Sequence, residues 1–342
     1  MRVLLLGGTG LLGNHVWRQL LAESHEVTLL VRSADGVDWQ DIDEEGRART
    51  RVVAGSPLCE DTLRTTAAGC QALVNCVGCT DMSLLRYEGY LPANRDICTL
   101  LVKAMEATGA QSLVHVSTAN TIGFGAPGQP ADETAPMSQP FSDSFYARSK
   151  HEGEQILLRY AHERPERHVV VACPGFLIGR YDHKPSSGRL MLAAYRHPLM
   201  LCPSGGKSFV AARDVAAAVA HALTMGTSGT RYLLTGESLT LAEFYRMQAS
   251  AMGYRQRVVV LPDWLALAAG RVGDLLRLAG VRTELCTRNV RQLLVREHYD
   301  SGRAHRELMM PRTPMEEAVR EFFTDARSHR HFAPDQDRQA CH

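Results

Sequence analysis

A tyrosine and a lysine four residues apart form the pair of side chains best suited to proton transfer in this chain. Tyr146 and Lys150 stand in the segment YARSKHEGEQILLRY, and on a helix this spacing puts both side chains on one face. A nearby ammonium favours the phenolate, so we expect Lys150 to lower the pKa of Tyr146. Such a tyrosine exchanges a proton with a carbonyl or an alcohol near neutral pH. The alternative, an exposed surface pair, is the more ordinary one for an isolated Tyr-x-x-x-Lys.

Two hydroxyl residues follow a short apolar run upstream of this pair. The segment LVHVSTANTIG is predicted to be a strand that ends at Ser117 and Thr118. A hydroxyl at the carboxyl end of a central strand can hydrogen-bond the oxygen of a reacting carbonyl. Serine and threonine in such places more often form turns, but the motifs before and after this strand favour a catalytic role.

The chain begins with a glycine pattern that is typical of a phosphate-binding turn. Val3–Leu6 reads as a buried strand, and Gly7, Gly10 and Gly13 follow it three residues apart. The next apolar residues recur at helical spacing: Leu12, Val16, Trp17 and Leu20. Glycine lets a diphosphate approach the main chain closely, and the helix directs its positive dipole end at that anion. Strand, glycine turn and helix together predict a dinucleotide site.

Apolar strand-like runs alternate with helical segments through the first half of the chain. The runs are Val3–Leu6, Glu26–Val31, Thr50–Val53, Ala72–Val77, Ser112–Val116 and His168–Ala172. Such alternation predicts an α/β fold, a Rossmann-type doubly wound parallel sheet with a smaller, mixed C-terminal substrate-binding region. We expect a dinucleotide-binding domain over residues 1–180. A substrate-binding region should cover 181–325, with 208–236 returning to the sheet, a loop-rich lid over 182–206, and a loose tail over 326–342.

Composition excludes several classes of partner. The chain has 342 residues, a net charge of +1, 45% hydrophobic and 22% charged residues, which is ordinary for a soluble globular protein and gives no field that would attract nucleic acid. The start of the chain lacks the pattern of a signal peptide, and nine scattered cysteines fit a reduced, cytoplasmic protein.

The longest apolar stretch runs over residues 258–280. Pro262, Asp263, Arg271, Asp274 and Arg277 interrupt it, so no membrane span is predicted. We expect an amphipathic helix that packs on the body of the protein through Leu265, Leu267, Ala268, Val272, Leu275 and Leu276. Association with a membrane surface is the less favoured alternative.

Residues after the second predicted strand should select the cofactor. A carboxylate there would bind the ribose hydroxyls of NAD, but Arg32 and Ser33 stand in its place, and both suit a 2′-phosphate. NADP is therefore favoured over NAD. Cys76 and Cys79 form a C-x-x-C, which we interpret as pocket lining rather than as a redox or zinc motif, and no metal site is predicted.

Taken together, these motifs resemble the extended short-chain dehydrogenase/reductases of the NAD-dependent epimerase/dehydratase superfamily, in particular the dihydroflavonol-4-reductase-like branch. The resemblance extends to about Asp325, and it rests on GGTGLLG, NCVG, HVSTANTIG, YARSK, CPGFLIGRYDHKPSSGR, RDVAAAVAHAL and RYLLTGESLTLAEF. Agreement in order and spacing is specific for a fold and much less so for a substrate.

The resemblance implies roles for individual residues. Tyr146 would be the general acid/base, Lys150 would bind the nicotinamide ribose, and Thr118 would orient the substrate, with Ser117 as neighbour or substitute. Asn94 would support a proton relay or merely pin its helix to a strand. The implied cofactor-binding residues are Gly7, Thr9, Gly10, Leu11, Leu12, Arg32, Ser33, Cys76, Val77, Gly78, Lys150, Pro174 and Phe176.

Two further expectations come from the resemblance. Ser56 stands where relatives commonly carry an acidic residue for the adenine, so that contact would use backbone groups only. Relatives often form homodimers through two helices, which here would contribute Ile97, Leu100, Leu101, Ile156, Leu157 and Tyr160. The same residues equally suit packing against the sheet.

Several reactions share this scaffold. A sugar dehydratase is disfavoured because Ala119 and Asn120, not an acidic pair, follow Thr118. A nucleotide-sugar epimerase is the alternative, with Arg189, Arg196 and Lys207 as possible anion ligands, and a non-catalytic dinucleotide sensor is a second one. We favour an NADP(H)-dependent ketone reductase of secondary metabolism, acting on an apolar small molecule whose pocket would include Met82, Phe124, Phe145 and Tyr195.

Overall fold

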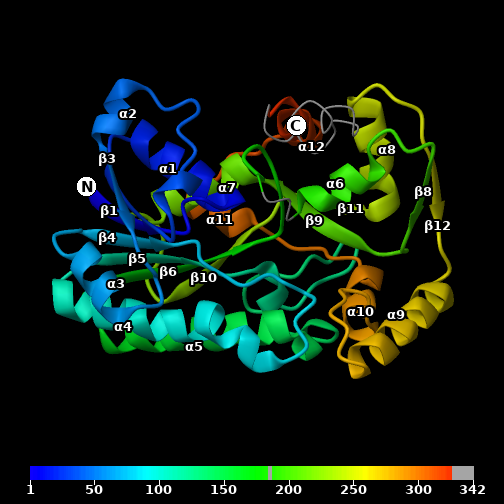
Figure 1. Cartoon of the computed structure of the whole chain (residues 1–342), viewed down its shortest axis with the longest axis horizontal. Helices are drawn as coiled ribbons and strands as arrows, with labels where there is room; N and C mark the ends of the chain where they lie inside the picture. Colours follow the sequence, from blue (N-terminus) through cyan, green and yellow to red (C-terminus); the bar gives the residue numbers. More distant parts are fainter. Residues whose placement is uncertain (184–186, 326–342) are drawn as a thin grey trace, which may run out of the picture.

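A parallel sheet of seven strands runs through the middle of the molecule (Figure 1). The structure is a computed structural model, and it describes residues 1–183 and 187–325. The strand order is β10-β6-β5-β4-β1-β2-β3, and every neighbouring pair is parallel. The strands are β1 (Arg2–Leu6), β2 (Glu26–Val31), β3 (Thr50–Ala54), β4 (Ala72–Asn75), β5 (Ser112–Val116), β6 (His168–Pro174) and β10 (Thr230–Leu234). The predicted doubly wound sheet is thereby confirmed.

Helices cover both faces of this sheet. One face carries α1 (Leu11–Ala22) and α7 (Ala212–His221), with α2 (Glu44–Ala48) and α11 (Gly302–Glu307) beside them, and the other face carries α3 (Glu60–Ala67), α4 (Ile97–Thr108) and α5 (Phe145–Glu163) (Figure 1). Val3 and Leu5 belong to the first core, whereas Leu4 and Leu6 belong to the second. Because both faces are buried, the strands read as continuous apolar runs.

Beyond β6 the chain builds a second, smaller layer. β7 (Phe176–Ile178) lies parallel to β9 (Gly206–Ala211), which pairs antiparallel with β11 (Glu237–Thr240). β8 (Leu199–Cys202) pairs with β12 (Arg257–Val260). The helices of this layer are α6 (Gly188–Ala194), α8 (Leu241–Ala251), α9 (Asp263–Leu278), α10 (Thr287–Leu294) and α12 (Met315–Thr324). This mixed layer is the smaller region that the sequence predicts.

The structure corrects three sequence expectations. β4 ends at Asn75, so Cys76 and Val77 lie in the loop beyond the strand. Residues 182–206 are not loop throughout, because α6 and β8 lie within them. Residues 184–186 fall outside the described residues, as does the predicted tail over 326–342. The prediction that α9 buries its apolar face was wrong: Leu265, Leu275 and Leu276 are exposed.

The strand order reverses at β1, whose two neighbours are β2 and β4. In open parallel sheets a ligand binds at this switch point, beyond the carboxyl ends of the strands. The glycine turn between β1 and α1 occupies this place. An added Cβ on Gly13 would lie 2.1 Å from the carbonyl oxygen of Gly7, so glycine is required for the helix to pack this closely on the turn.

We expect Gly13→Ala to destabilise the cofactor-free protein by about 1–3 kcal/mol, since the new methyl group overlaps a backbone oxygen that cannot move away. Urea denaturation followed by circular dichroism measures the change. Gly10→Ala is the matched control in the same turn, because its Cβ would meet nothing closer than 3.5 Å. Equal stability of the two variants would contradict this account of the turn.

Candidate active site

A cavity of about 630 Å³ lies along the carboxyl ends of the central strands. Its walls come from the glycine turn, from the ends of β4 and β5, from α5, and from the later segments around residues 174–189 and 284–297. The predicted residues that line it are Thr9, Gly10, Leu11, Leu12, Arg32, Cys76, Gly78, Met82, Ser117, Thr118, Tyr146, Lys150, Pro174 and Phe176. The structure therefore brings motifs from five parts of the sequence to one site.

The side chains of Tyr146 and Thr118 both line the cavity wall. Tyr146 lies in the first turn of α5, which Ser144 caps by accepting from the amide of Ala147. Thr118 follows the end of β5 and caps a short 3-10 turn by accepting from the amide of Asn120 at 3.3 Å. A phenol and a hydroxyl from two different elements thus face the same cavity.

Lys150 is buried between the ends of two strands. Its Nζ donates to the carbonyl oxygen of Val116 at 2.9 Å and to that of Val77 at 3.3 Å. Val116 ends β5, and Val77 lies just beyond β4, so the ammonium anchors α5 to the centre of the sheet. Gly78 permits this placement, because a Cβ there would lie 2.8 Å from Nζ.

Burial sets the protonation chemistry of the pair. It raises the pKa of Tyr146 to about 12, and the neighbouring Thr118 hydroxyl opposes this only in part. Burial also lowers the pKa of Lys150. Our expectation that Lys150 lowers the pKa of Tyr146 is not met, because desolvation dominates and raises it. Tyr146 is therefore a protonated donor at neutral pH.

Ser117 turns away from the pair toward a buried carboxylate. Its Oγ donates to Glu154, which also accepts from Thr121 at 2.6 Å. Arg231 lies 3.8 Å from the other carboxylate oxygen. Glu154 is fully buried, and sequence reasoning missed it. Its position four residues after Lys150 on the same helix face is the signal that would have found it.

Asn94 ties the loop after β4 to α5. It lies in a π-helical turn, Pro92–Asp96, just before α4, and its side chain is fully buried. Its Oδ1 accepts from the amide of Cys79 at 2.7 Å, and its Nδ2 donates to Cys79 O at 3.0 Å and to Ser149 Oγ at 2.9 Å. Because all these bonds are structural, the geometry supports the pinning role that the sequence left open.

The glycine turn has the features that a dinucleotide requires. Gly10 caps α1 without a side-chain bond, and the first turn of the helix carries no acidic residue. The positive end of the helix dipole therefore meets the cavity uncompensated. Gly7 has φ of +81°, and a Cβ there would lie 2.8 Å from the backbone of Cys76. The turn thus fits a diphosphate, and Lys150 lines the same cavity.

Of the two residues predicted to select the cofactor, one lines the cavity and the other does not. Arg32 is exposed and lines the cavity. Ser33 does not line it, and its hydroxyl caps the turn Ala34–Gly36 by accepting from the amide of Asp35 at 3.3 Å. Gly36 of this turn lies against Thr9: a Cβ added to Gly36 would be 3.7 Å from the methyl group of Thr9. Arg32 therefore stands beside the phosphate-binding turn.

The cysteines of the C-x-x-C segment have no sign of redox or metal chemistry. Burial raises the pKa of the Cys76 thiol to about 12, which keeps it protonated and unreactive. Across the described ranges, 1–183 and 187–325, no three His, Cys, Asp or Glu side chains gather as metal ligands. Cys76 lines the cavity as a small apolar residue.

Of the four residues proposed to contact substrate, Met82 alone lines the cavity. Phe124 packs edge-on against Phe141, and Phe145 packs beneath Arg288, whose guanidinium lies 3.6 Å from the ring centre. Tyr195 stacks on Phe323 at 4.5 Å. These three side chains have packing partners elsewhere, since tertiary contacts that the sequence does not show decide their orientation.

Much of the outer cavity wall comes from residues that no sequence motif singled out. They include Asn120, Leu177, Tyr181, His183, Asn289, Gln292, Leu293 and Glu297. Lys207 is buried in an ion pair with Glu297 and donates to the carbonyl of Gln292 at 3.1 Å. Arg189 pairs with Glu284 at 2.7 Å. Two of the three cations that we considered as anion ligands, Arg189 and Lys207, thus already have carboxylate partners.

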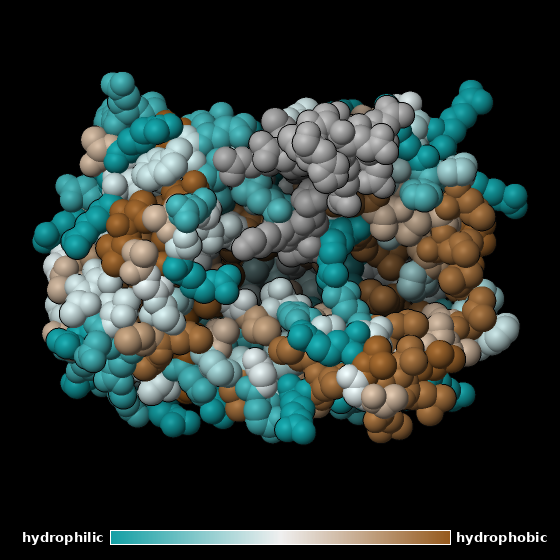
Figure 2. Space-filling model, in the orientation of Figure 1, coloured by the Kyte–Doolittle hydropathy of each residue, from teal (hydrophilic) through white to brown (hydrophobic). Residues whose placement is uncertain are grey.

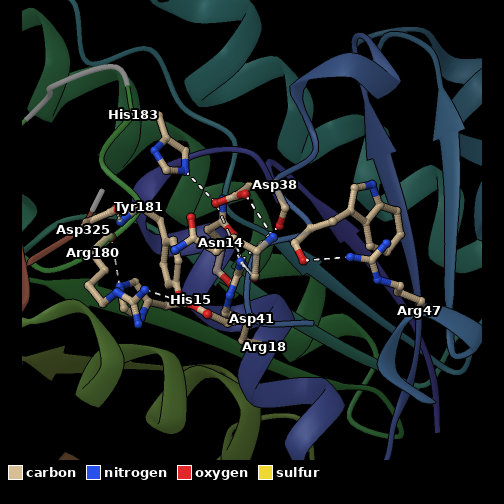
Figure 3. A network of polar contacts seen from close by, with 12 residues as sticks. Asn14, His15, Arg18, Asp38, Asp41, Arg47, Arg180, Tyr181, His183 and Asp325 are labelled. Atoms are coloured by element: carbon tan, nitrogen blue, oxygen red, sulfur yellow. Dashed lines mark hydrogen bonds and ion pairs between the residues drawn. The ribbon is translucent and has the colours of Figure 1, made fainter. Parts of the chain in front are cut away.

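A polar network closes one end of the cavity by joining α1 to the segment after β7 (Figure 3). The Arg18 guanidinium stacks 3.9 Å from the centre of the Tyr181 ring, and His183 Nε2 lies 2.9 Å from a carboxylate oxygen of Asp38. His15 Nε2 contacts the carbonyl of Arg180 at 3.1 Å. These contacts hold the smaller layer against the glycine-turn helix.

Comparison with known proteins assigns the family. Residues 3–234 match the NAD dependent epimerase/dehydratase family, so the chain belongs to it. The expected class, an NAD(P)-dependent enzyme of the extended short-chain dehydrogenase/reductase type, is thereby confirmed, as is the resemblance to the dihydroflavonol-4-reductase-like branch.

Sequence identity to individual relatives is low. The chain is 26% identical to a putative dihydroflavonol 4-reductase of Synechocystis sp., over 92% of this chain and 91% of that protein. It is 27% identical to the 4-hydroxy-2-methyl-3-oxo-4-farnesyl-3,4-dihydroquinoline-1-oxide ketoreductase of Stigmatella aurantiaca, over 80% of each chain. The crystal structure of a nucleoside-diphosphate-sugar epimerase from Pseudomonas aeruginosa superposes with a TM-score of 0.73 at 21% identity, covering 97% of this chain and 98% of that one, which shows the shared fold.

The network in Figure 3 should weaken in acid, because burial lowers the pKa of His15 to about 4. The unfolded chain binds this proton near pH 6.5, so stability falls as pH drops from about 6.5 toward 4. We expect a contribution of about 2 kcal/mol to be lost by about pH 5.

Urea denaturation at neutral pH and at about pH 5 tests this in the wild type and in His15→Gln. The variant should lose less stability on acidification than the wild type. His162→Gln, at an exposed position of α5, is the matched control and should behave like the wild type. The same acid loss in all three proteins would contradict the assignment to His15.

Proposed function

We propose that this protein is an NADP(H)-dependent reductase that interconverts a ketone and a secondary alcohol on an apolar, aromatic or lipid-like small molecule. The observation that carries the proposal is that Tyr146, Thr118 and the buried Lys150 line the same cavity as the glycine turn. A carbonyl oxygen near both hydroxyls would meet a donor and an orienting group together.

The chemistry divides simply between cofactor and protein. Bound NADPH supplies a hydride to the carbonyl carbon. Tyr146 donates its proton to the carbonyl oxygen, and Thr118 orients that oxygen. The raised pKa of Tyr146 keeps the phenol protonated at neutral pH, which suits the reduction direction. Lys150 binds the nicotinamide ribose and favours the phenolate that remains after proton transfer.

Two features support an apolar substrate. The name of the Stigmatella relative describes a ketoreductase acting on a farnesylated quinoline, a large ketone with little charge. In this chain Met82, Phe176, Leu177 and Leu293 line the cavity. A nucleotide-sugar epimerase is the second candidate because of the shared fold, but Lys207 and Arg189 are engaged in ion pairs rather than left for a sugar diphosphate. The intact Tyr146 and Lys150 argue against a non-catalytic sensor.

The other expectations remain part of this proposal. The partner is a small molecule, and the predicted homodimer through the helices now seen as α4 and α5 stays a prediction. In α4, Ile97 and Leu101 are fully buried, and in α5 so is Leu157, so these three pack inward. Leu100 and Ile156 are only partly buried and leave a smaller face for a second copy.

Tyr146→Phe should lower kcat with a panel of apolar ketones at least about 100-fold, because the proton donor is lost. Tyr160→Phe is the control on the same helix: its hydroxyl donates to Glu106 at 2.7 Å, and it does not line the cavity. Oxidation of NADPH followed by absorbance measures turnover, and fluorescence titration checks that both variants bind cofactor. Retained turnover in Tyr146→Phe would refute the assignment.

Arg32→Asp should raise KM for NADPH about 10- to 100-fold and shift preference toward NADH, since a carboxylate repels the 2′-phosphate and accepts ribose hydroxyls. Arg159→Asp, an exposed position on α5 outside the cavity, controls for the change in net charge. The ratio of kcat/KM for the two cofactors is the readout. An unchanged ratio would reject the phosphate contact.

A further inference from the structure

Helix α9 presents large apolar side chains to solvent. Trp264 is 70% exposed, Leu275 67% and Leu278 85%. The exposed apolar residues of this helix are Trp264, Leu265, Val272, Leu275, Leu276 and Leu278, which we call the α9 face. Single exposed leucines are common on soluble proteins, but a cluster of this kind marks an interaction surface. Figure 2 shows it as the brown area at the lower right.

The outward orientation follows from how α9 is packed. Its inner side carries Gly270 and Gly273, the two buried residues of the helix. A Cβ on Gly273 would lie 1.7 Å from the carbonyl oxygen of Leu285, and one on Gly270 would lie 3.0 Å from Thr287. The helix therefore packs through its backbone against the segment that leads into α10. Bulky side chains are excluded from that contact, so they occupy the opposite side.

A half-buried arginine fixes α9 to the body of the protein. Arg277 donates to the carbonyl of Thr283 at 2.9 Å and to those of Met82 and Leu84 in the loop after β4. The apolar surface continues from the helix onto the adjoining β8–β12 pair, where Leu199 and Leu201 are each 50% exposed. The α9 face is thus a firmly held surface.

The charge around this face is strongly positive. Residues 255–296 contain eight arginines and three acidic residues, a net charge of +5, although the whole chain carries only +1. Arg271 is exposed on α9 itself. A second cavity, between the start of α5 and α10, is lined by Arg148, Arg288 and Arg291, with Asp143 and Asp274. The segment that carries the apolar face is therefore rich in cations, with Arg271 exposed on the same helix.

We propose that the α9 face docks on the surface of an anionic phospholipid bilayer, with the helix lying in the plane of the interface. Apolar side chains would enter the acyl boundary, the arginines would meet lipid phosphates, and Trp264 suits the headgroup level. A second copy of the chain fits less well, because a two-fold contact would place +5 against +5. Over residues 1–183 and 187–325, no helix is long and apolar enough to span a membrane.

The α9 face lies next to one wall of the cavity, so docking would affect the candidate active site. Asn289, Gln292 and Leu293 on α10 line the cavity, and α10 packs directly against α9. Docking would therefore hold one wall of the cavity near the lipid. Delivery of a lipid-like ketone from the bilayer rests on the proposed function, whereas docking itself does not and is measured without substrate.

Co-sedimentation of the full chain with vesicles tests docking. We expect binding to phosphatidylcholine vesicles with about one third phosphatidylglycerol, and weaker binding to pure phosphatidylcholine or at high salt. The double variant Leu275→Glu/Leu278→Glu should reduce partitioning about tenfold or more. Leu58→Glu, in the exposed turn between β3 and α3, is the matched control and should bind like the wild type.

Tryptophan fluorescence gives an independent readout, because Trp17 is buried and Trp39 partly buried, whereas Trp264 is exposed. Vesicles should shift the emission of the wild type to the blue, and Trp264→Phe should abolish the shift. Failure of the wild type to bind anionic vesicles would overturn the proposal. So would a dimer that dissociates in the double variant without lipid, as seen by light scattering, since the face would then bind a second copy. Ketone turnover of the double variant in solution separates failure of docking from failure of the proposed reaction.

Discussion

A buried ammonium held by two backbone carbonyls sets the geometry of this protein's site. Lys150 binds the carbonyl oxygens of Val116 and Val77, so α5 is fixed where two central strands end. Burying a charge is costly unless hydrogen bonds replace its hydration, and here backbone groups at the sheet edge supply them. One helical turn earlier, Tyr146 lines the same cavity as Thr118. The same anchoring places the Glu154 carboxylate behind Ser117. One helix, α5, therefore supplies both the phenol of the site and the buried carboxylate that supports it.

The parts of the fold that depend on local pattern were predictable. Six strands were placed within two residues at each end, since strands buried on both faces read as apolar runs. The glycine turn, Tyr146, Lys150 and Thr118 could be identified from the sequence because each belongs to a short motif, and the spacing within that motif is typical of its chemistry. The Y-x-x-x-K pair depends only on one helical turn. The direction of the Tyr146 pKa was not predictable in this way, because desolvation depends on atoms from several elements.

The outer wall of the cavity could not be predicted, because it comes from residues that are distant in the sequence. Gln292 and Glu297 reach the site through α10 and its following segment, and Lys207 joins them from β9. Nothing in their local pattern distinguishes a lining residue from a packed one. Phe145 shows the converse: it stands next to Tyr146, yet the cation of Arg288 covers its ring. Adjacent residues on a helix point in different directions, so proximity in sequence does not give proximity in the site.

In α9, glycine residues reverse the usual relation between the apolar side of an amphipathic helix and its buried side. A stripe of leucines normally indicates the buried side, since burial of apolar area is favourable. In α9 the opposite side carries Gly270 and Gly273, and only these two residues allow the backbone to contact Leu285 and Thr287 so closely. Close backbone packing excludes the leucines from the interior. The glycines at i and i+3 were present in the sequence, and they identify the packed side more directly than hydrophobicity does.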